Sequence, residues 1–110
     1  MSQTQQSINI DTHIEVKHII YQGLYLRTKI SVEVKGSLTM NDKELYFEPE
    51  TYSVNIYPHD YSKYLGEIAE KIAIMRQKMV EKINRFLQMK DAIIASLKDQ
   101  GVVVEKFVED

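Results

Sequence analysis

Apolar and polar residues alternate along the chain from Ile8 onwards, which predicts β-strands that each bury one face. The apolar residues of the first two runs carry even numbers: Ile8, Ile10, Ile14, Val16 and Ile20, then Leu24, Leu26, Ile30, Val32 and Val34. Residues paired in an antiparallel sheet share a face, so the numbers of two paired residues should have an even sum. A three-residue loop, Tyr21–Gly23, meets this condition by pairing Ile20 with Leu24.

The alternation continues through two further turns. Gly36 is expected to mark a bulge or a strand end. Asn41–Glu44 has the composition of a turn, and Glu48–Thr51 has that of a second four-residue connection. The apolar residues around these turns are Leu38 and Met40, then Leu45 and Phe47, then Tyr52, Val54 and Ile56. Three hairpins in series predict an antiparallel meander of four strands.

The second half of the chain has the pattern of one long helix. The run Asp60–Asp99 contains a single glycine and no proline, and its apolar residues recur at steps of three and four. Asp60 or Ser62 is expected to cap the start of this helix. The apolar stripe shifts by one residue after Met79, which fits either a continuous helix or a break at Gln88–Asp91.

Gly101 is expected to end the helix, and the apolar residues after it predict a short C-terminal strand. These residues are Val102, Val103, Val104, Phe107 and Val108. The predicted fold is therefore α+β: a four-stranded antiparallel β-meander, one long and either continuous or broken α-helix, and a short C-terminal strand. Residues 1–7 are predicted to form a disordered tail, and residues 8–110 a single domain.

The length of the helix suggests a partner. A continuous helix over this run would be about 57 Å long, whereas a compact domain of this size is about 33 Å across. We therefore expect a homo-oligomer, with a dimer favoured, in which a second chain covers the excess apolar surface. The expected interface, shared with the core of the domain, is the helical seam: Leu65, Ile68, Ile72, Met75, Met79, Ile83 and Phe86.

Composition excludes several classes of function. The chain has 110 residues and a formal net charge of −2, which gives no overall attraction to nucleic acid or anionic membranes. It has no cysteine, which excludes disulfides, zinc fingers, iron–sulfur clusters and thiol catalysis. The polar N-terminus is unlike a signal peptide, and no apolar run is long enough to span a bilayer. We expect a cytoplasmic protein that needs no cofactor.

The three histidines offer little catalytic or metal-binding chemistry. His13 and His18 lie five residues apart on a strand, so they should face opposite sides of the sheet and are not expected to share a metal ion. His59 precedes Asp60, and an imidazole beside a carboxylate can act as a general base. Adjacent residues at a helix start seldom point at each other, so Asp60 is expected to cap the helix instead.

Two surface features are candidates for binding. An aromatic patch at the tip of the first hairpin comprises Ile19, Tyr21 and Tyr25, which are expected on the outward face. A basic stripe shares one side of the helix and comprises Lys71, Lys78, Lys82 and Arg85. The stripe could contact nucleic-acid phosphates, or an acidic surface on a second copy of the chain.

These observations favour a non-enzymatic, homo-oligomeric protein-interaction or adaptor module. The first alternative is a nucleic-acid-binding regulator that uses the basic stripe. The second alternative is a small ligand-binding or hydrolytic protein centred on His59.

Overall fold

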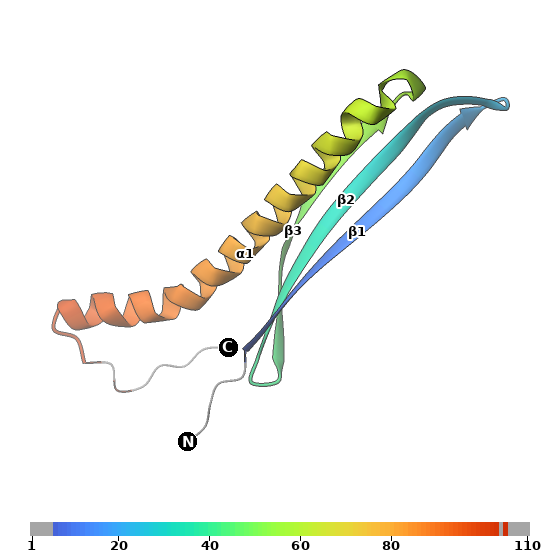
Figure 1. The fold of residues 1–110 in the computed structure, drawn as a ribbon. Helices are drawn as coiled ribbons and strands as arrows, with labels where there is room; N and C mark the ends of the chain where they lie inside the picture. The colour runs from blue at the N-terminus through green and yellow to red at the C-terminus, as the bar shows by residue number, and fades with distance from the viewer. Residues whose placement is uncertain (1–5, 104, 106–110) are drawn as a thin grey trace.

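The computed structural model describes residues 6–103 and Glu105, and these residues form one antiparallel sheet and one long helix (Figure 1). The elements are β1 (Gln6–Tyr21), β2 (Leu24–Met40), β3 (Lys43–Ile56), a 3₁₀ turn η1 (Pro58–Asp60) and α1 (Tyr61–Asp99). The strand order is β1-β2-β3. The predicted α+β class, antiparallel sheet and long helix are confirmed, whereas a fourth strand and a C-terminal strand are not present among the described residues.

The predicted turn at Glu48–Thr51 is wrong, because β3 runs through it as one strand. Leu38 pairs with Leu45, which gives an odd sum, and Ile30 pairs with Val54, which gives an even sum. The register shifts between Val34 and Gly36, so a bulge on β3 changes the parity where a turn was expected. A bulge can hold Pro49, which has no N–H to donate to a ladder.

The loop of the first hairpin is also shorter than predicted. Tyr21 pairs with Leu24 across a two-residue turn, and Gln22 and Gly23 have φ angles of 49° and 78°, as a type I′ turn requires. The register then shifts by one residue at Leu26 of β2. From Ile19 back to Gln6 of β1, the numbers of paired residues have the expected even sum. The register over the rest of the hairpin is consequently displaced from the predicted one. The second hairpin closes with the same kind of turn, with φ angles of 51° and 66° at Asn41 and Asp42.

The two ends of the chain differ from prediction where the structure describes them. Gln6 and Ser7, expected in the tail, pair with Met40 and Thr39 in the sheet. At the other end, Val102 and Val103 have no regular structure. The rest of the predicted tail, residues 1–5, lies outside the described residues, as do Val104, Phe107 and Val108 of the predicted C-terminal strand.

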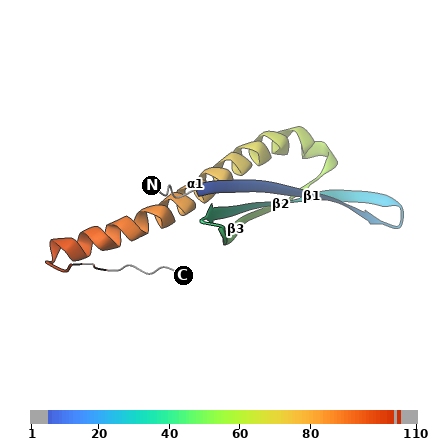
Figure 2. The same ribbon diagram turned by 90° about the horizontal axis from the view of Figure 1, so that it is seen from below.

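Helix α1 is continuous through residues 88–91 and packs its apolar stripe on one face of the sheet (Figures 1 and 2). The fully enclosed core lies where it crosses β2, and consists of Val32, Val34, Leu38, Met75, Met79 and Ile83. Gly36 is neither a strand end nor the bulged residue, but sits under α1 against Met79. The helix ends as expected, with Gly101 at a φ of 80°.

The molecule is elongated. Its principal extents are 69 × 27 × 22 Å and its radius of gyration is 21.0 Å, whereas a compact chain of this length would have a radius of gyration of about 13 Å. The final turns of α1 curve away from the sheet (Figure 1). An elongated layer pair leaves a large share of its apolar surface near the edges, and those edges hold the candidate sites.

Candidate interaction surface

The helical seam predicted as the oligomer interface faces the sheet of its own chain. Ile68, Met75, Met79 and Ile83 are buried, and Ile72 and Phe86 are half-buried. The Phe86 ring meets the Phe47 ring edge-on, with 5.6 Å between the centroids. Leu65, near the start of the helix, is the exposed member of the set at 46%. In this fold the seam forms the core, and a second chain would need other surface.

Apolar surface remains on β1, because α1 covers β2 and β3 more fully. The register pairs Ile10 with Gly36 and Ile14 with Val32, so the even residues of β1 lie on the face that carries the helix. Four of these side chains are apolar and exposed, and we call them the β1 strip: Ile8 at 41%, Ile14 at 50%, Val16 at 53% and Ile20 at 62%. The alternation predicts this apolar face, but it does not reveal that the helix leaves it open.

The hairpin tip has a groove beside the start of the helix. This groove has a volume of about 350 Å³, and its lining includes His18, Tyr25, Ile56, Tyr61 and Leu65. His18 Nδ1 lies 2.8 Å from the hydroxyl of the buried Thr28, which also contacts the Tyr25 hydroxyl. The imidazole is therefore hydrogen-bonded, although the residue is exposed.

The aromatic patch predicted at this tip is divided between the two faces of the sheet. The bulge at Leu26 pairs Tyr25 with Ile20, which places Tyr25 on the helix side with His18. Ile19 and Tyr21 alternate with Ile20 along β1 and therefore lie on the opposite face. Beyond the bulge, an even residue number on β2 no longer means that the side chain lies on the helix side of the sheet. The spacing of residues in the sequence therefore could not predict this division.

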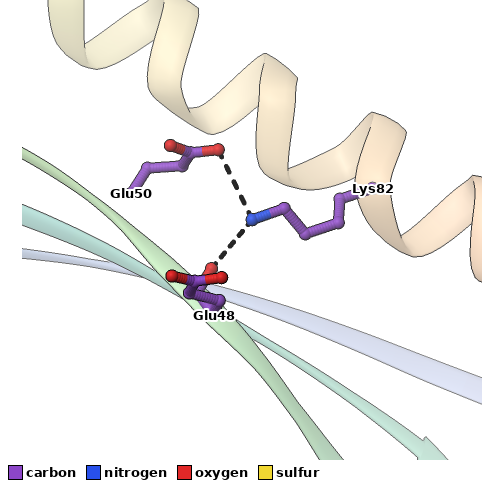
Figure 3. Close-up of polar contacts among 3 residues, drawn as sticks. All are labelled: Glu48, Glu50 and Lys82. Carbon is purple, nitrogen blue, oxygen red and sulfur yellow. Dashed lines mark hydrogen bonds and ion pairs between the residues drawn. The ribbon is translucent and has the colours of Figure 1, made fainter.

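The basic stripe lies along β3 and meets acidic side chains there. Lys82 Nζ donates a hydrogen bond to the Glu48 backbone carbonyl at 2.9 Å, and lies 3.4 Å from Glu50 Oε1 (Figure 3). Lys71 lies over the Tyr52 ring, 5.7 Å from its centroid. Lys78, Lys82 and Arg85 line a hollow of about 410 Å³ together with Glu50 and Glu81. The predicted grouping on one side is present, but the neighbouring carboxylates offset its positive charge.

The His59–Asp60 pair differs from expectation. His59 Nε2 lies 3.2 Å from Asp60 Oδ2, so the two side chains do contact, and Asp60 makes no side-chain hydrogen bond that caps α1. The His59 side chain is 78% exposed and its ring stacks on Tyr57, with 6.2 Å between centroids. An imidazole–carboxylate contact in open solvent has no enclosed space in which to orient a substrate.

A polar hollow that the sequence analysis missed lies on the sheet. It has a volume of about 370 Å³, and its lining includes His13, Glu15, Lys29, Glu33 and Ser53. Pairing across the strands brings these residues together, as with His13 opposite Glu33, and only the correct register would have revealed the group. Within residues 6–103 and Glu105, no three histidine, aspartate or glutamate side chains are placed to share a metal ion.

Comparisons with protein-family models, with curated proteins and with solved structures gave no match to this chain. In the part of the chain that the structure describes, no helix combines the length and apolar character needed to cross a lipid bilayer.

Proposed function

We propose that this chain is a non-enzymatic protein-interaction module that acts as a homo-oligomer, with a dimer as its simplest form. The observation that carries the proposal is the β1 strip, where Ile14 and Val16 are neighbours on one face of the strand, Ile20 follows beyond His18, and each of the three is at least half exposed. Isolated exposed apolar residues are ordinary, but several of them along one face of a single strand are typical of a surface that a partner covers.

The energetic gain from covering this row is appreciable. Burying a whole aliphatic side chain contributes about 1.5–3 kcal/mol, so covering the exposed half of one contributes roughly 1 kcal/mol. In a two-fold dimer both copies contribute the same patch, so the gain from each of these side chains is obtained twice. The strip alone can therefore offset a substantial part of the entropy lost on association.

The helical seam contributes to this function indirectly. With Met79 and Ile83 at 0% exposure, the seam holds the helix on the sheet and thereby fixes which part of β1 stays open. The proposal therefore places self-association on the strip and no longer on the seam.

The nucleic-acid alternative has weaker support. A phosphate-binding surface needs cations that are free to replace counterions. Lys82 instead contacts Glu50 and the Glu48 carbonyl, and Lys71 stacks on Tyr52. The stripe supports a structural role along β3 better than a role in binding a polyanion.

Sedimentation velocity at protein concentrations from about 5 to about 200 µM tests the proposal, a range that brackets dimers of moderate affinity. The expected result is a species of twice the 12.9 kDa chain mass, whose share grows with concentration. Small-angle scattering provides a second reading, because a single chain has a radius of gyration of 21.0 Å. A monomer of that size throughout the range would refute homo-oligomerisation.

A further inference from the structure

The outer edge of β1 is an open sheet edge. The strand order is β1-β2-β3, so β1 pairs with β2 on one side, and among the described residues no strand pairs with its other side. In Figure 1, β1 lies on the opposite side of β2 from β3, and Arg76 of α1 reaches this strand to donate a hydrogen bond to the Thr12 hydroxyl at 2.6 Å. Every second residue of an edge strand presents an unpaired N–H and C=O, which another strand can bind.

The two edges of the sheet are protected to different degrees. The β3 edge carries Pro49 and a bulge, and the Glu48 carbonyl already accepts a hydrogen bond from Lys82. These are common means of blocking an edge. In contrast, β1 (Gln6–Tyr21) has no proline. Its pairing with β2 has one register shift, and the extra residue at that shift, Leu26, belongs to β2. The β1 edge is thus long and regular, and within residues 6–103 no strand other than β2 pairs with it.

We propose that the β1 edge pairs antiparallel with β1 of a second copy, with Ile14 on the two-fold axis, to form a continuous six-stranded sheet. The inference rests on the proposed homo-oligomeric function and names the surface that performs it. A two-fold axis requires that if residue i meets residue j, then j meets i, so paired numbers have a constant sum. Matching the faces of the two strands requires that this sum be even.

On the face away from the helix, charge favours this register over the two adjacent ones. With Ile14 on the axis, Asp11 lies opposite Lys17 of the second copy, and His13 lies opposite Glu15. By symmetry each pair occurs twice. An axis at His13 would set Asp11 against Glu15, and an axis at Glu15 would set that carboxylate against its own copy. Like charges directly opposite each other are destabilising, so both neighbouring registers are disfavoured.

The same register matches apolar residues on the helix side. Ile14 meets its own copy, Ile8 meets Ile20, and Thr12 meets Val16. All four residues of the β1 strip then have an apolar side chain or the methyl group of a threonine opposite them. The pairing extends from Ser7 to Tyr21, nearly the whole strand. Ile10 lies opposite His18, and at the other positions of this face backbone pairing, charge pairing and cross-strand apolar contact favour the same arrangement.

Cysteine cross-linking tests the register directly, because the chain has no native cysteine. Ile14→Cys should form a covalent dimer on mild oxidation, since directly opposed Cβ atoms lie about 5 Å apart. Val16→Cys is a matched control on the same face, and Thr12→Cys is a second control that also removes the hydrogen bond from Arg76 to the Thr12 hydroxyl. Each is offset by four residues from its own copy, about 13 Å, so neither should cross-link alone. A mixture of these two variants should cross-link to each other.

Charge reversal provides an independent test. Asp11→Lys and Lys17→Asp should each raise the dimer dissociation constant about tenfold, because each replaces two attractive pairs with two repulsive ones. The double variant should restore dimerisation. The control is the double exchange Glu50→Lys with Lys82→Glu, an ion pair between β3 and α1 at the opposite edge of the sheet from the proposed junction. That exchange should leave the dissociation constant unchanged.

The outcomes separate this inference from the proposed function. A wild-type dimer in which neither Ile14→Cys nor the mixed pair cross-links would overturn the β1 junction and leave homo-oligomerisation standing. A wild-type dimer that Val16→Cys alone cross-links would overturn the register. A wild-type monomer in sedimentation would remove the proposed function together with the junction.

Discussion

Replacing Gly36 with alanine should destabilise the fold, because α1 passes directly over this residue. A Cβ at position 36 would lie 2.5 Å from Met79 Cγ, closer still to the Met79 sulfur, and 3.2 Å from Ile83 Cδ1. Both helix residues have 0% exposure, so neither can turn out to solvent to make room. The new methyl group therefore has to push the helix away from the sheet or force strained rotamers.

The expected loss is the difference between two effects. Overpacking a closed core costs about 1–3 kcal/mol. Replacing a glycine inside a strand returns about 0.5–1 kcal/mol, because alanine loses less conformational freedom on folding. Gly36→Ala should therefore lower the free energy of unfolding by up to about 2.5 kcal/mol, with a central value of about 1 kcal/mol, which corresponds to a melting temperature lower by roughly 5 °C.

Gly66 supplies a matched control for the same substitution. It lies in the exposed part of α1, and a Cβ added there meets nothing within 4 Å. Gly66→Ala should raise the free energy of unfolding by about 0.5–1 kcal/mol through helix propensity. Urea denaturation followed by circular dichroism, at one fixed protein concentration, measures both variants.

A double variant tests the contact itself. Met79→Ala alone should cost about 2–5 kcal/mol by leaving a cavity. Combined with Gly36→Ala it should cost less than the sum of the two, since the new methyl group enters that cavity. Additive losses, or a Gly36→Ala variant that gains as much stability as Gly66→Ala, would refute the close approach of helix and strand.

Two further predictions concern polar groups. Lys82→Gln should lower the free energy of unfolding by no more than about 1 kcal/mol, since the contact with Glu50 is partly exposed; the difference in denaturation midpoint should shrink in 1 M salt, and a loss that persists there would contradict this assignment. A hydrogen bond to Glu44 and the charge of that carboxylate hold the pKa of Tyr46 above its ordinary value. The neutral phenol is thus favoured in the folded chain, so this contribution to stability is present below the ordinary tyrosine pKa and is lost as pH rises through the folded value. Glu44→Gln should move part of the tyrosine absorbance titration to lower pH, and Tyr46→Phe should remove that part.

Local patterns predicted much of the fold because they report local geometry. The period of two from Ile8 identifies strands and their buried face, and the spacing of three and four identifies α1. The basic stripe was correctly grouped on one side of the helix for the same reason. The candidate site was predicted less well. Its row of apolar side chains is visible in the sequence, but its exposure is not.

What the sequence by itself determined is therefore the type of each long element and the face that each would bury, since both follow from side-chain periodicity. Only the tertiary structure decided the rest. A one-residue bulge and a turn can both move the apolar residues between even and odd numbers. The number of strands around Pro49 and the face on which Tyr25 lies therefore depended on three-dimensional pairing. Which strand the helix covers least also depended on tertiary packing, because the close approach of α1 to the sheet at Gly36 lies over β2.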